Sequence, residues 1–193
     1  MPIKRGLVGA SLGRRGIVLT ALVASAACAS SEFSTTGPQD QGNYTASVVA
    51  GADTTRLSGN AIISTTQNSS GLTYLVFYLW TGTPGGMAYD VFWLQRENLT
   101  IPTPGVYTID DVGANLAAAD DFVALYAFAD SAAAAATFHS VVGTITVDAS
   151  AFEEVSGSFE FVAAFDENSY HSGTVADTVR VVGTFRAAPG TIY

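Results

Sequence analysis

The feature that most constrains the fold is a period-two pattern that recurs four times, with a glycine among apolar residues on one face of each segment. The segments are residues 57–63, 141–147, 155–161 and 181–187. The opposite face carries Ser, Thr, Asn, Glu or Arg at most positions. This alternation predicts β-strands that bury one face and expose the other.

The inward-facing glycines need a physical reason, because glycine weakens a strand. A glycine can make room for a bulky side chain from the facing sheet, or it can mark a bulge or a sharp bend. Trp80, Trp93 and the phenylalanines are the residues expected to supply the bulk. The unequal spacing of the four segments argues against a solenoid repeat and fits a two-layer sandwich.

Three further segments are apolar on both faces. They are residues 72–80, 88–94 and 122–128. A Gly/Pro-rich stretch joins the first two as a hairpin, and weaker signals at 44–49 and 106–109 bring the total to about nine strands. The alanines at 132–136 are too few for an isolated helix, so we interpret them as a hairpin tip or a single turn. We therefore predict an all-β fold over residues 43–193, an antiparallel two-layer β-sandwich.

The first 27 residues have the character of an export signal. Four of the eight basic residues stand at the start of the chain: Lys4, Arg5, Arg14 and Arg15. The apolar stretch at 16–27 is shorter than the roughly 20 residues that a membrane-spanning helix needs. Residues 1–27 are therefore interpreted as a signal peptide. Arg14 and Arg15, followed by Gly16 and two apolar residues, also resemble a twin-arginine export motif, so both export routes stay open.

The sole cysteine, Cys28, stands at the end of this signal, after Ser25, Ala26 and Ala27. This resembles a bacterial lipobox, in which small residues precede a cysteine that is lipidated and becomes the mature N-terminus. The resemblance implies a protein anchored by lipid to the bacterial cell envelope, at the outer membrane or cell surface. Residues 28–42 then form the lipidated N-terminus and a flexible Ser/Thr/Gly/Pro-rich tether. Ordinary cleavage at an Ala-x-Ala-like site is the alternative and gives a secreted or periplasmic protein.

The net negative charge of the chain limits which partners it can bind. The whole chain has a net charge of −9, and removing residues 1–27 leaves four arginines, no lysine and all 17 acidic residues, so 4 − 17 gives −13. A surface of this sign excludes nucleic acid as a partner, because nucleic-acid binding needs a basic face, and it repels anionic partners. With a single cysteine, no intramolecular disulfide and no zinc site built on two or four cysteines can form.

Two histidines, His139 and His171, are the only candidates for acid–base catalysis of the triad type. Neither a Gly-x-Ser-x-Gly elbow nor a His-Glu-x-x-His motif is present in the sequence. We interpret His139 as a strand-end residue and His171 as a loop residue. We predict no catalytic residue, no bound transition metal and no cofactor.

Acidic residues recur in adjacent pairs that flank the predicted strands. The pairs are Asp110 and Asp111, Asp120 and Asp121, Glu153 and Glu154, and Asp166 and Glu167. We interpret them as solvated loop residues. Calcium binding is the first alternative, with Asp110, Asp111, Asp120 and Asp121 as the candidate ligands. A hydrolase that uses two carboxylates on a glycoside is the second.

Aromatic residues gather between positions 74 and 93. Most of them are expected to be core. The segment 72–80, however, offers Tyr74, Tyr78 and Trp80 on its second face, which something must cover. Tyrosine and tryptophan suit such a surface because each has an apolar body and a polar tip. We therefore name Tyr74, Tyr78 and Trp80 as the candidate surface for a ligand or partner.

Three strand motifs carry a family resemblance: Pro-Gly-Val-Tyr-Thr-Ile-Asp at 104–110, Val-Ser-Gly-Ser-Phe-Glu-Phe at 155–161, and Val-Val-Gly-Thr-Phe at 181–185. Together with the lipobox, they resemble small bacterial envelope lipoproteins with an uncharacterised β-sandwich domain, over residues 43–187. That group has no assigned activity, so the resemblance implies export and fold without a mechanism. We expect a non-catalytic binding or structural module with a protein, peptide or glycan partner. A carbohydrate- or peptide-binding module that uses the aromatic hairpin, and the hydrolase above, are the alternatives.

Overall fold

The computed structural model describes residues 42–82, 88–112, 120–131, 134–151, 153–169 and 175–192. Arg14, Arg15, Cys28 and His171 lie outside these residues. The described residues form nine strands: β1 (Gly42–Ala50), β2 (Asp53–Gln67), β3 (Thr73–Thr81), β4 (Tyr89–Arg96), β5 (Gly105–Asp110), β6 (Phe122–Ser131), β7 (Ala134–Ala151), β8 (Glu154–Phe165) and β9 (Thr178–Pro189). The prediction of an all-β fold is confirmed. Of the alanine run, residues 134–136 belong to the start of β7.

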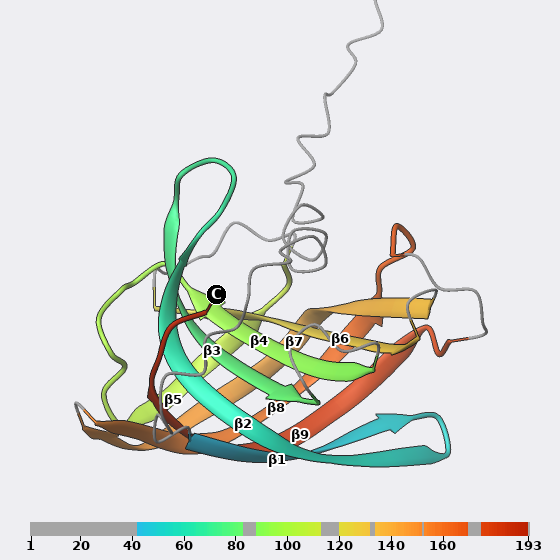
Figure 1. Cartoon of the computed structure of the whole chain (residues 1–193), viewed down its shortest axis with the longest axis horizontal. Helices are drawn as coiled ribbons and strands as arrows, with labels where there is room; N and C mark the ends of the chain where they lie inside the picture. The colour runs from blue at the N-terminus through green and yellow to red at the C-terminus, as the bar shows by residue number, and fades with distance from the viewer. Residues whose placement is uncertain are drawn as a thin grey trace, which may run out of the picture.

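The strands form one sheet that closes on itself as a barrel, in the order β1-β2-β3-β4-β6-β5-β7-β8-β9, with β9 returning to β1 (Figure 1). Two short pairings are parallel, β2 with β9 and β5 with β6, and the others are antiparallel. The prediction of an antiparallel two-layer sandwich is therefore confirmed only in part, because the strands form one continuous sheet with both parallel and antiparallel pairings. Alternation along a strand is the same in a sandwich and a barrel, so it does not distinguish them.

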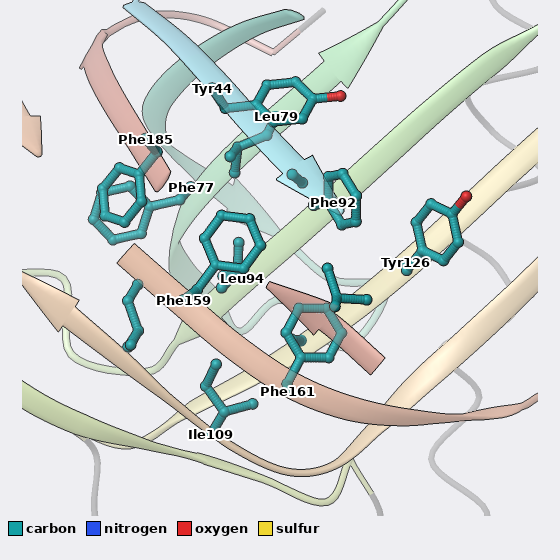
Figure 2. Packing of buried hydrophobic residues seen from close by; sticks show 14 of the residues in the cluster. Tyr44, Phe77, Leu79, Phe92, Leu94, Ile109, Tyr126, Phe159, Phe161 and Phe185 are labelled. Carbon is teal, nitrogen blue, oxygen red and sulfur yellow. The ribbon is translucent and has the colours of Figure 1, made fainter. Parts of the chain in front are cut away.

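Alternate side chains of every strand point into a common interior, which aromatic rings fill. Figure 2 shows these rings from β1, β3, β4, β6, β8 and β9 packed against one another. The centroids of Phe92 and Tyr126 lie 4.9 Å apart in a stacked arrangement, and those of Phe77 and Phe185 also lie 4.9 Å apart. The interior of the barrel is thus a packed core, as expected for a small closed sheet.

The four inward glycines each stand directly opposite an aromatic residue on a neighbouring strand. The register pairs Gly59 with Tyr44, Gly143 with Phe161, Gly157 with Phe185, and Gly183 with Phe159. A Cβ atom added to Gly157 would lie 3.1 Å from Cζ of Phe185. The prediction that the glycines make room for bulky side chains therefore holds. Phenylalanines supply three of the four rings, as predicted, but from adjacent strands of the same sheet and not from a facing sheet. Trp80 and Trp93 were wrong as sources of bulk, because they alternate with the inward residues of β3 and β4.

Candidate functional site

The predicted aromatic surface lies on the outer side of β3. Leu75, Phe77 and Leu79 of this strand are buried in the core cluster, so Tyr78 and Trp80 point the other way. The Tyr78 ring stacks on Trp80 with centroids 5.2 Å apart, and its edge meets Trp93 of β4 at 5.3 Å. The structure thus brings two of the three predicted residues into one cluster, which we call the outer aromatic cluster (Tyr78, Trp80 and Trp93).

Exposure differs among the three predicted residues. Tyr74 and Tyr78 are half-buried, whereas Trp80 exposes only 9% of its surface. The Tyr74 hydroxyl oxygen accepts a hydrogen bond from Nδ2 of Asn68 at 3.2 Å. Burial raises the pKa of Tyr78, with a further contribution from Tyr89, so its hydroxyl stays protonated and able to donate. A ligand on this surface would therefore meet Tyr74, Tyr78 and the half-buried Trp93 rather than Trp80.

A polar cluster that was not predicted from the sequence lies inside the barrel. The Tyr126 hydroxyl donates to Oδ1 of Asp90 at 2.8 Å, and the Tyr44 and Thr81 hydroxyl oxygens are 2.6 Å apart. Figure 2 shows Phe92 between Tyr44 and Tyr126, with both hydroxyl groups directed to the same side. A sequence signal was present, because Asp90 has the same parity as Phe92 and is the only charged residue in the segment 88–94.

Burial controls the electrostatics of this interior cluster. It raises the pKa of Asp90 above its ordinary value, and the hydrogen bond from Tyr126 opposes the rise. It also raises the pKa of Tyr44 to about 12, and burial together with the Asp90 charge raises that of Tyr126. Both phenols are therefore neutral donors at physiological pH. Chemically, the cluster can hold a proton on Asp90 at a pH where an exposed aspartate is ionised.

We expect Asp90→Asn to change how stability depends on pH. A carboxyl group whose pKa is raised in the folded state contributes stability fully below its unfolded pKa of 3.8 and loses it as the pH rises through the folded pKa. Asparagine keeps an acceptor for Tyr126 and removes the charge. Thermal unfolding followed by circular dichroism should give similar melting temperatures at pH 3.5 and a relative gain for the variant at pH 7. A difference that does not vary with pH would contradict the expectation.

His139 is tied to a carboxylate on the outside of β7. Its Nε2 atom lies 3.2 Å from Oδ2 of Asp166, and Nδ1 is buried without a hydrogen-bond partner in the described part of the chain. Burial acts to raise the pKa of Asp166, but hydrogen bonds from Asn168 and His139 outweigh it and lower that pKa. This arrangement orients the imidazole, and among the described residues neither ring nitrogen is hydrogen-bonded to a serine or a cysteine.

The acidic pairs are distributed over different places in the fold. Oδ1 of Asp120 accepts a hydrogen bond from Asn98 at 2.6 Å and lies 3.5 Å from Arg96, and Glu154 binds Arg186 at 2.9 Å. Asp110 ends β5, where its carbonyl oxygen accepts a hydrogen bond from Ser140. Within the described ranges no group of three or more His, Cys, Asp or Glu side chains is placed to hold a metal ion.

The fold and these clusters define a class, an all-β protein with a closed, ring-filled barrel. In the comparisons with known proteins, no family, no curated protein and no solved structure matches the chain. Of the residues that the structure describes, none form a helix long and apolar enough to cross a membrane.

Proposed function

We propose that this chain is an exported bacterial envelope protein, anchored by a lipid on Cys28, whose barrel acts as a non-catalytic binding or structural module. The observation that carries the second part is the packed interior. Phe77, Phe92 and Phe159 are at most 2% exposed. The Phe92 ring stacks on Tyr126 of β6 and packs at a tilt against Phe159 of β8. Because side chains fill the interior of the barrel, binding at its outer surface is favoured.

Support for the anchor comes from the sequence that precedes the barrel. β1 begins at Gly42, fourteen residues after Cys28 (42 − 28), which is enough for a short polar tether between a lipid and the first strand. Stable anchoring needs more than one acyl chain, so the mature protein should carry at least two. The location that follows is the outer membrane or the cell surface, and a secreted or periplasmic form is the alternative.

The test is Cys28→Ser, compared with the wild type in fractionated cells. The wild type is expected in the membrane fraction, and the variant is expected to leave it, because the substitution removes the only thiol that can be acylated. Mass spectrometry of the mature N-terminus checks the modification directly. An unchanged membrane-bound fraction, or a mature N-terminus downstream of residue 28, would refute the anchor.

A second candidate is that the module binds a glycan or a peptide through Tyr74, Tyr78 and Trp80. The contact between Tyr78, Trp80 and Trp93 favours it, because aromatic residues gathered on an outer sheet face are typical of binding surfaces. Under this candidate, Tyr78→Ala should abolish saturable binding while leaving the fold intact.

A further inference from the structure

The outside of the barrel is divided into two chemically different halves. Outward side chains on β3 and β6, such as Val76 and Val123, are apolar and buried. Outward side chains on β1 and β9, such as Thr45, Thr184 and Arg186, are mostly polar and exposed, and Val182 is an apolar exception. The second half is therefore a free polar surface, and it lies on the neighbouring strands β8, β9, β1 and β2.

Hydroxyl groups form a row across these four strands. The register places Ser158 opposite Thr184, Thr184 opposite Thr45, and Thr45 opposite Ser58. The hydroxyl oxygens of Thr45 and Thr184 lie 3.1 Å apart. A row of this kind offers donors and acceptors at the regular spacing of neighbouring strands, about 4.8 Å.

The row lines an open depression of about 580 Å³. Its polar lining consists of Thr45, Ser47, Arg56, Ser58, Ser158 and Thr184. Ala46, Leu57, Val182 and Gly183 complete the lining. The accessible lining of the depression is mainly apolar, with several hydroxyl groups and one guanidinium group placed on it. This composition suits a sugar, which offers an apolar ring face as well as hydroxyl groups.

Charge distinguishes this half from the rest of the body. Arg56, Arg180 and Arg186, the exposed arginines of the described chain, all belong to β2 and β9. Glu160 accepts hydrogen bonds from Arg180 and Glu154 from Arg186, whereas Arg56 has no ion-pair partner among the described residues. Salt limits the repulsion from distant acidic residues to about 8 Å at physiological ionic strength, so nearby charges decide what binds there. Glu160 stands opposite Val182 of the lining but is paired with Arg180, which leaves Arg56 as the charge without an ion-pair partner among the described residues of the depression.

We propose that this depression binds a glycan strand that carries a carboxylate. Arg56 binds the carboxylate through paired N–H donors, and the row of hydroxyl groups exchanges hydrogen bonds with the hydroxyl groups of the sugars. The inference rests on the proposed function only for the location that supplies such a glycan, since the envelope is where the exported protein would meet it. The site differs from the outer aromatic cluster, which lies on the other half of the barrel.

The test is affinity electrophoresis of the full-length protein in gels that contain polygalacturonate, with dextran gels as the neutral comparison. We expect retardation by polygalacturonate and little by dextran. Arg56→Gln should weaken binding about tenfold or more, the effect expected for a lost charge-assisted pair. The double variant Thr45→Val, Thr184→Val should also weaken it. Arg180→Gln is the matched control, because it removes the same charge from the same half of the barrel but lies outside the depression.

Several outcomes would overturn the proposal. These are no retardation by polygalacturonate, equal retardation by dextran, or equal weakening by Arg56→Gln and Arg180→Gln, which indicates general charge attraction. If Tyr78→Ala removes binding and Arg56→Gln does not, the outer aromatic cluster is the site. Membrane fractionation of the Cys28→Ser variant is a separate readout, so failure of glycan binding is distinguishable from failure of the proposed anchor.

Discussion

Replacing Gly183 by alanine is expected to lower the free energy of unfolding by about 3 kcal/mol, the upper end of what overpacking a core costs. The added Cβ would lie 2.9 Å from Cε1 of Phe159 and 2.7 Å from the carbonyl oxygen of Thr45. The ring of Phe159 is only 2% exposed and packs against Phe92, Phe161 and Phe185, so it has little room to move. Urea denaturation followed by tryptophan fluorescence measures the loss.

Gly105→Ala is the matched control for this prediction. Gly105 also lies in a strand, but the nearest atom to its added Cβ is 3.8 Å away, an ordinary contact. Its effect should stay within about 0.5 kcal/mol, as for most surface substitutions. Strand propensity favours alanine over glycine at both positions, so equal losses for the two variants would show that the contact with Phe159 does not explain the glycine.

Replacing Arg96 by alanine is expected to destabilise the barrel by about 3 kcal/mol, because it removes a large buried side chain and leaves a cavity. Arg96 is 2% exposed, and its guanidinium carbon lies 5.6 Å from the centroid of the Tyr107 ring and 5.5 Å from that of Phe122. Its Nη2 atom donates to the carbonyl oxygen of Thr100, and Nη1 faces Asp120. It therefore joins β4 to the segment that leads into β5.

Arg96→Met separates volume from charge at this position. Burial lowers the pKa of Arg96, and its Nε atom is buried without a partner in the described chain, so the charge itself is poorly compensated. A methionine fills similar space, and it should cost less than about 1 kcal/mol because Asp120 is 61% exposed and stays solvated when its arginine partner is lost. If methionine destabilises as much as alanine in urea denaturation, the polar contacts of Arg96 dominate over its packing.

The strands were predictable because alternation is a local property of the chain. The segments 141–147, 155–161 and 181–187 fall within β7, β8 and β9. The outward position of Tyr78 and Trp80 followed from the same alternation. Their stacking on one another was not predictable, because it depends on side-chain conformations that the alternation leaves open.

The pairing within the interior polar cluster could not be predicted from any one segment of the sequence. Asp90 is inward by parity, yet nothing in its own segment names Tyr126 as its partner, because 36 residues separate them and only the pairing of β4 with β6 brings them together. The hydroxyl row has the same origin. Thr45 and Thr184 meet only because β9 returns to β1 when the sheet closes.

The sequence by itself determined that this chain is all-β, which face of the four glycine-bearing strands points inward, and that each of these strands has a glycine among its inward positions. These are consequences of the period-two geometry of a strand and of the volume available beside it. Only the tertiary structure decided that the sheet closes, that Tyr44, Phe159, Phe161 and Phe185 fill the spaces the glycines leave, and that Arg56 shares a depression with the hydroxyl row. The physical reason is register, which is set by contacts between strands far apart in the chain and not by any one segment.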